Sequence, residues 1–192
     1  AMFVEKEFGW DVAKSFVKKR FKKNIINEYP IVPGRNGTTE NKSGTDIYYK
    51  AAYVLHSLRY LIGDEVFLSS LKEYLLMPKE QPNNQTSTKE FISLINENTG
   101  LDLGWFFNQY LFKSKLPQLN IKESLYKGKK YIDIWWENKG FKMPLEISYK
   151  TTNDFRKRKL YLDNTPKRIT AKIDSKLNID PEGWVLFEKN KY

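Results

Sequence analysis

Two adjacent tyrosines, Tyr48 and Tyr49, are the residues of this sequence whose type and place most suggest chemistry. They stand at the start of a long apolar stretch, residues 44–67, which is typical of a buried helix, a break at Gly63 and a second helix. A phenol keeps its proton at neutral pH and can both donate and accept a hydrogen bond. The pair therefore indicates either hydroxyl groups that serve a reacting group or ordinary aromatic side chains at the start of a helix.

The composition excludes most other catalytic chemistry. Cysteine is absent, which excludes disulfides and thiolate metal sites. The single histidine, His56, cannot form an H-E-x-x-H motif, because that motif needs two histidines on one helix. We interpret His56, which lies within the predicted helix, as a packing or surface residue rather than a catalytic one.

The sequence carries a net charge of +10, from 33 basic and 23 acidic residues, and most of the excess falls after residue 116. A basic excess can attract anionic partners. The lysine-rich face of the first predicted helix is equally the polar side of an amphipathic helix, so we predict no nucleic-acid partner. No apolar run approaches the roughly 18 residues of a membrane span, and no signal peptide is recognised. We expect a soluble protein of the cytoplasm or the cell envelope.

Apolar residues recur at spacings of three and four through the first part of the chain, which predicts helices with one buried face. The first predicted helix, residues 9–27, has its apolar positions at Trp10, Ala13, Val17, Phe21 and Ile25. A long loop, residues 27–46, follows it. The next helix, residues 46–62, is assigned a buried face of Ala51, Leu55, Leu58 and Ile62. Gly63 is a natural end for this helix.

Three more helices are predicted before the pattern changes. The inner face of the first of them is Phe67, Leu71, Tyr74 and Leu75. After a loop at residues 78–85, Ser87 and Glu90 have the spacing of a capping box, and Gly100 ends that helix. The last helix can be capped by Asp102, and its apolar stripe is Leu103, Phe106, Phe107, Tyr110 and Leu111.

From Pro117 onward the apolar residues alternate, which indicates strands. The alternating sets are Ile132, Ile134 and Trp136, and then Leu145, Ile147 and Tyr149. Residues 126–130 are predicted as a hairpin turn, with further strands in residues 158–173 and 180–187. About six short strands with frequent turns predict a small β-sandwich.

The predicted fold class is therefore α+β. An N-terminal helical subdomain of about five helices, residues 1–116, is followed by a small antiparallel β-sandwich, residues 117–192. This order of elements makes a family resemblance recognisable.

The chain resembles the C-terminal part of the aminopeptidase N-like zinc metallopeptidases, also called gluzincins. The resemblance rests on the segment after the family's third zinc ligand, the tyrosine-bearing helix, the helical pair that closes the catalytic domain, its exit into the next domain, and two sandwich strands. In chain order these are residues 3–11, 46–67, 87–111, 115–119, 141–147 and 179–187. The match covers essentially the whole chain.

The resemblance implies a role for one tyrosine of the pair. In the family, a catalytic tyrosine precedes one residue, a lysine and a small pair at the start of this helix. Tyr48, Tyr49, Lys50, Ala51 and Ala52 match that order, so Tyr48 is the implied catalytic residue, although Ala51 stands where glycine is common. Its phenol would donate a hydrogen bond to the oxyanion that forms when zinc-bound water attacks a peptide carbonyl.

The resemblance also implies a fragment. The family's H-E-x-x-H helix and later glutamate ligand are not in this sequence, and one histidine cannot supply the three protein ligands of a catalytic zinc site. The opening Ala-Met agrees with a piece of a longer protein. We therefore expect zinc and the peptide substrate to belong to a full-length parent, with no metal bound by this chain alone.

Two further expectations remain. The alternative function is a non-catalytic interaction module that binds a peptide, a glycan or an acidic partner through the β-sandwich. A fragment should also expose an apolar patch around Tyr48, Ala52 and Leu55, because the zinc-ligand helices that cover this helix in the family are missing. Self-association through the helical part is the expected consequence.

Overall fold

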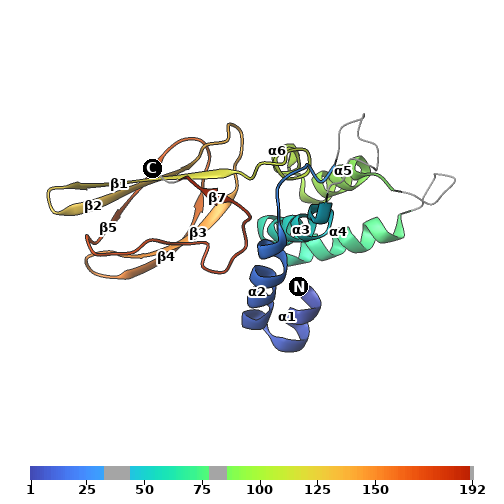
Figure 1. The fold of residues 1–192 in the computed structure, drawn as a ribbon, viewed down its shortest axis with the longest axis horizontal. Coiled ribbons are helices and arrows are strands. Elements are labelled where there is room, and N and C mark those ends of the chain that lie inside the picture. The colour runs from blue at the N-terminus through green and yellow to red at the C-terminus, as the bar shows by residue number, and fades with distance from the viewer. Residues whose placement is uncertain (33–43, 78–85, 191–192) are drawn as a thin grey trace.

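The structure, a computed structural model, describes residues 1–32, 44–77 and 86–190. The helices gather at one end of an elongated molecule and the strands at the other (Figure 1). Within the described residues six α-helices precede seven strands, so the predicted α+β class is confirmed. The domain limits, 1–116 and 117–192, stay a prediction. None of the described helices is long and apolar enough to cross a membrane.

The N-terminal segment is not the single helix that the sequence predicts. Helix α1 spans Met2–Phe8, which the prediction missed, and α2 spans Trp10–Phe16. Gly9 separates them with φ 82°, a left-handed conformation that glycine adopts without strain. The chain then continues as a π-helical turn over Val17–Phe21 and a 3₁₀ turn over Lys22–Asn24. Within the residues that share one apolar pattern, the helix therefore changes type twice.

The predicted apolar face of this segment does turn inward. Ala13 and Val17 are buried, while Phe21 and Ile25 pack against the core. The spacing of three and four thus survives the change of helix type. Of the loop predicted after it, residues 33–43 lie outside the described residues.

Helix α3, Tyr49–Ile62, is central, and Gly63 with φ 86° ends it as predicted. The predicted buried face is only partly right. Leu58 is fully buried, but Leu55 is 37% exposed, because the side of the helix that carries it faces a groove. The side chains that turn inward with Leu58 include Lys50, Tyr53 and Ser57.

The remaining helices are α4, Asp64–Leu76, α5, Thr88–Thr99, and α6, Gly104–Leu111. On α4 Phe67 is buried as predicted, but Leu75 is 75% exposed, which corrects its assignment to the inner face. The helix ends one residue later, at Leu76, which is also exposed. The loop predicted at residues 78–85 lies outside the described residues.

Local capping signals were read correctly. Ser87 and Glu90 form the predicted capping box, in which each side chain accepts a hydrogen bond from the other residue's backbone N–H. Gly100 ends α5 in the left-handed conformation. Asp102 accepts a hydrogen bond from the N–H of Gly104 at 2.9 Å, at the start of α6. These short-range features depend little on tertiary context.

Two sheets follow, with strand orders β5-β2-β1-β7 and β4-β3-β6. The strands are β1 Gln118–Tyr126, β2 Lys129–Trp136, β3 Pro144–Lys150, β4 Phe155–Tyr161, β5 Lys167–Ala171, β6 Asn178–Ile179 and β7 Glu188–Lys189. Both predicted alternating sets are buried, and Lys127 and Gly128, both with positive φ, make the predicted hairpin turn. One strand prediction is wrong: residues 184–187 are irregular, and β7 follows them and pairs parallel to β1.

The irregular segment 180–187 joins the helical and strand parts. Buried carbonyl groups outside regular structure need donors, and hydroxyl groups of the helices supply them. The hydrogen bonds run from Tyr53 to the carbonyl of Gly183, from Ser57 to that of Trp184 and from Tyr110 to that of Leu186, at 2.7, 2.8 and 2.7 Å. The inner side of α3 is thereby fixed to the strand part.

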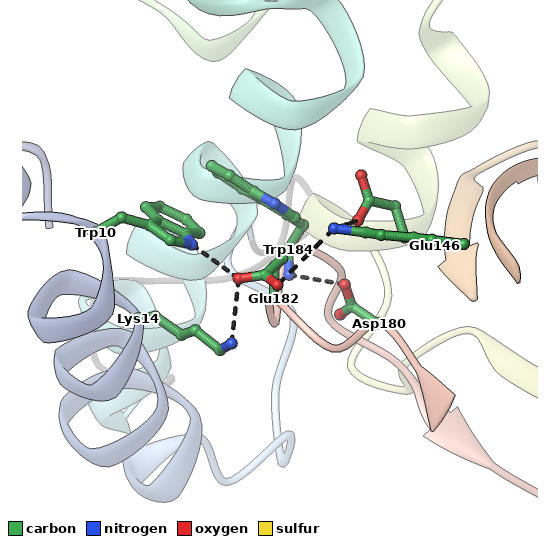
Figure 2. Close-up of polar contacts among 7 residues, drawn as sticks. Trp10, Lys14, Glu146, Asp180, Glu182 and Trp184 are labelled. Carbon is green, nitrogen blue, oxygen red and sulfur yellow. Dashed lines mark hydrogen bonds and ion pairs between the residues drawn. The ribbon is translucent and has the colours of Figure 1, made fainter. Parts of the chain in front are cut away.

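Ring stacking and ion pairing complete this junction. The ring of Trp184 stacks with those of Trp10 and His56, with centroids 4.3 and 4.5 Å away. Figure 2 shows the carboxylate of Glu182 accepting hydrogen bonds from the indole of Trp10 at 2.8 Å and from Lys14 at 3.1 Å. Helix α2 is therefore held against the same segment that binds α3.

Candidate active site

Tyr48 lies between a 3₁₀ turn, Gly44–Ile47, and the first residue of α3. Its N–H donates to the carbonyl of Thr45 at 3.0 Å, and its carbonyl accepts from Ala52 at 2.9 Å. The side chain is 70% exposed, and no described residue hydrogen-bonds to its hydroxyl group. The backbone of Tyr48 is thus fixed in the first helical turn while its phenol stays available.

Two residues before Tyr48, Asp46 is 2% exposed despite its charge. Its two carboxylate oxygens accept the backbone N–H groups of Ile26 and Asn27 at 2.9 and 2.6 Å. Burying a carboxylate costs free energy unless it is hydrogen-bonded, and these two donors meet that need. Asp46 therefore ties the start of α3 to the segment that follows α2.

Two residues after Tyr48, Lys50 is fully buried. Its ammonium group donates to the carbonyls of Lys113 and Ser114 at 3.1 and 2.7 Å. Burial lowers the pKa of Lys50, and the nearby carboxylate of Asp46 opposes that shift. Lys50 thereby ties the start of α3 to the connection between α6 and β1. Together the two charged residues hold the peptide backbone on both sides of Tyr48.

Neither anchor was recognised from the sequence. Lys50 is part of the residue order on which the resemblance rests, but the sequence alone indicates no role for it. Asp46 is the last residue of the predicted loop. A signal did exist: two charges of opposite sign flank the tyrosine at equal distance at the start of an otherwise apolar helix.

Tyr49 has a different environment from its neighbour. It is partly buried, and the guanidinium group of Arg20 lies 5.8 Å from the centre of its ring, within cation–π range. The two hydroxyl-bearing side chains are therefore not equivalent. Tyr48 is the one that projects freely into solvent.

An apolar groove runs along the outer side of α3, beginning one helical turn after Tyr48. It has a volume of about 300 Å³ and lies between α1, α3 and α4. Its apolar lining includes Met2, Phe3, Ala52, Leu55, Phe67 and Leu71. Tyr48, Ala52 and Leu55 follow the four- and three-residue spacing of one helix side, so Tyr48 precedes the groove by one helical turn but is not one of its lining residues. Ala52 and Leu55 line this groove, and the larger apolar patch expected around all three residues stays a prediction.

A buried arginine closes the other end of the groove. Arg59 of α3, 8% exposed, forms ion pairs with Glu5 of α1 and Asp64 of α4. The Arg59 guanidinium lowers the pKa of the Asp64 carboxyl below its ordinary value. This network fixes the three helices that form the groove walls, so the groove is a built feature of the helical part.

The remaining candidate, His56, is nearly buried, and its exposed edge borders the groove. It is 6% exposed and stacks on Trp184, and burial lowers its pKa to about 4. Within residues 1–32, 44–77 and 86–190, no three His, Cys, Asp or Glu side chains are grouped so that they could hold a metal ion. The side chains present do not fit a zinc site, and no step through a metal is assigned to them.

Comparisons with known proteins give likenesses to solved structures only. No family model matches the sequence, and no curated protein matches it. The fold is similar to the crystal structure of Legionella pneumophila aminopeptidase A in complex with aspartic acid, with a TM-score of 0.70 and 16% identity. The match covers 100% of this chain and 22% of that chain. At this identity the likeness shows the fold alone, and the chain spans about a fifth of that protein's length.

Proposed function

We propose that this chain is part of a zinc-dependent aminopeptidase of the aminopeptidase N-like, or gluzincin, family, and that Tyr48 stabilises the oxyanion during hydrolysis of N-terminal peptide bonds. The observation that carries the proposal is the placement of this phenol. It is exposed, Asp46 and Lys50 anchor the chain on either side of it, and it lies one helical turn before Ala52, which lines an apolar groove. The peptidase-like fold supports the assignment.

The physical role follows from how hydrogen bonds act in catalysis. A donor accelerates a reaction when it is stronger in the transition state than with the bound substrate. The carbonyl oxygen of a peptide gains negative charge when it is attacked, so a phenol aimed at that oxygen binds it more tightly at that moment. Such a donor is worth about 2.7–4 kcal/mol of barrier when it is already in position. Two buried anchors beside Tyr48 provide that preorganisation.

Zinc and the peptide substrate belong, in this proposal, to a longer parent enzyme. The metal would polarise the carbonyl group and activate water when bound there. This chain contributes the hydroxyl donor, the rigid helix start and one wall of apolar surface. Its own carboxylates near Tyr48 are already engaged, because Asp46 accepts two backbone N–H groups.

The test is a pair of substitutions in the intact parent enzyme. Tyr48→Phe should lower kcat by about 10²–10³-fold and leave KM little changed, because the lost hydrogen bond exists mainly in the transition state. Tyr49→Phe is the matched control and should have a much smaller effect, since that side chain packs against Arg20. Equal effects, or a larger effect at Tyr49, would show that the phenol has been assigned to the wrong position.

A further inference from the structure

A second cavity shares no lining residue with the groove that follows Tyr48. It has a volume of about 370 Å³ and is formed by α2 with its π-helical extension, the 180–183 segment and β7. Four lysines line it: Lys14, Lys18, Lys22 and Lys189. The volume falls within the range of small-molecule sites. We call this feature the lysine pocket.

Helix geometry explains why three of these lysines reach one pocket. Lys14, Lys18 and Lys22 are each four residues apart. In a regular α-helix such residues drift around the axis in one direction, because a turn takes 3.6 residues. The wider π turn over Val17–Phe21 moves the next residue back the other way. Such π turns occur frequently at functional sites, and here the turn aligns the lysine row.

The carboxylates at the pocket already accept hydrogen bonds. Glu182 accepts from Trp10 and Lys14, as Figure 2 shows. Lys157 lies 4.0 Å from the other oxygen of Glu182, at the edge of ion-pair distance. Lys14 is thus the one lysine of the pocket that has an ion-pair partner among the described residues.

Asp180 is the only other acidic residue that lines the pocket within the described residues. It accepts the backbone N–H groups of Trp184 and Val185, each at 2.9 Å. Counting the four lysines against Asp180 and Glu182, the lining carries a net charge of +2 when all six groups are ionised. The excess lies on Lys18, Lys22 and Lys189.

These three lysines repel one another. The pKa of Lys22 is lowered, first because the pocket removes hydration from its ammonium group and further by the nearby charges of Lys189 and Lys18, against the opposing attraction of Asp180. On its other side Lys22 lies 5.7 Å from the ring centre of Phe187, which offers a weak cation–π contact and no neutralising charge. A dianion in the pocket would remove this repulsion.

We propose that the lysine pocket binds the phosphate group of a small phosphate monoester. A phosphate monoester carries about −1.5 to −2 charges at pH 7, which matches the surplus of +2, and lysine is an established phosphate binder. The volume exceeds that of phosphate alone, and the rings of Tyr53 and Phe187 form part of the wall, so the pocket has room for an apolar ester group. This site is independent of the function proposed for Tyr48.

The experiment is a calorimetric titration of the 192-residue chain at pH 7.5 and constant ionic strength. The two probes are inorganic phosphate and phenyl phosphate. Both should bind saturably at one site per chain. Tighter binding of phenyl phosphate identifies the monoester as the preferred ligand, and equal binding identifies the phosphate group alone as the recognised element.

The double substitution Lys18→Gln with Lys189→Gln should weaken binding by at least about tenfold, because each removes a charge-assisted hydrogen bond. The matched control, Lys72→Gln with Lys142→Gln, removes the same charge from exposed lysines that do not line the pocket, and should leave the affinity unchanged. NMR signals of Lys22 and Phe187 should shift on titration of the unsubstituted chain. Absence of saturable binding by both probes, or an equal loss in the control, would overturn the proposal.

Discussion

The two sides of α3 differ in how far their side chains are buried and hydrogen-bonded within the protein. On the inner side, Tyr53 and Ser57 donate to carbonyls of the 180–187 segment, and Leu58 is fully buried. On the outer side, Leu55 is 37% exposed along an open groove, and Tyr48, one turn before the groove, is 70% exposed. Both sides are rich in apolar residues. The apolar character of the residues alone therefore does not distinguish the buried inner side of α3 from its exposed outer side.

The difference also explains how an exposed side chain can be well positioned. The inner side fixes the axis of α3, and Asp46 and Lys50 fix its first turn. Tyr48 can then remain free of packing contacts and still have a defined place. A phenol that had to support the fold as well could not be presented to a partner in this way.

The largest expected contrast is between two leucines three residues apart on the same helix. Leu58→Ala should lower the free energy of unfolding by about 3–5 kcal/mol, because it leaves a cavity in the core. Leu55→Ala should cost less than about 1 kcal/mol, because its side chain borders open space. Urea denaturation of both variants beside the unsubstituted chain measures the two values.

Similar losses at the two positions would mean that the groove is closed in solution. The outer side of α3 would then be part of the core, and the exposure of Tyr48 would need another explanation. Because both variants remove the same atoms from the same helix, differences in helix propensity cancel between them.

A second contrast concerns pH on the inner side. Burial lowers the pKa of His56 from 6.5 to about 4, so the unfolded chain binds more protons between these values and stability falls as pH falls through them. Burial raises the pKa of Asp180 from 3.8 to about 6, so the folded chain binds more protons there and stability rises as pH falls. The two effects have opposite signs over nearly the same range and should largely cancel.

Single substitutions should separate them. Each pKa unit corresponds to about 1.4 kcal/mol, so each effect is about 3 kcal/mol at most. His56→Gln should become more stable relative to the unsubstituted chain as pH falls from 7 to 4.5, and Asp180→Asn should become less stable. Urea unfolding at the two pH values gives the slopes. Parallel slopes for all three proteins would show that neither group is buried as the junction requires.

Sequence reasoning succeeded where the chemistry is local. The Ser87–Glu90 capping box, the Gly100 helix end and the turn at Gly128 depend on neighbouring residues and were all predicted. The helix at Met2–Phe8 was missed because its apolar residues are mostly exposed, with Phe3 at 71%. No periodic buried face marks such a helix in the sequence.

The failures of the site prediction have a tertiary origin. The partners of Asp46 are 19 and 20 residues away in sequence, and those of Lys50 are 63 and 64 residues away, so the anchors of Tyr48 could not be inferred from local spacing. The strand predicted at 184–187 failed for a related reason. Its apolar residues are buried against the helices by side-chain hydroxyl bonds to the backbone, and they therefore need no strand partner.

The smallest expected effect concerns the outer side alone. Met2, Phe3 and Leu55 border the open groove with exposed fractions of 38%, 71% and 37%. Exposed apolar surface of this kind favours association. We expect weak self-association of the 192-residue chain, and Leu55→Glu should suppress it, because a carboxylate in the groove would have to lose its hydration without a partner. Light scattering at rising protein concentration measures the average mass.

The strand part supplies the matched control for this prediction. Leu125 on β1 is 68% exposed, so Leu125→Glu introduces the same charge at a comparable apolar position far along the chain from α3. It should leave self-association unchanged, and neither variant should change the free energy of unfolding by more than about 0.5 kcal/mol. If the chain stays monomeric at every concentration, or if Leu125→Glu reduces its self-association instead, the outer side of α3 is not the surface through which the chain associates. The two sides of the helix would then differ in burial but not in their contribution to self-association.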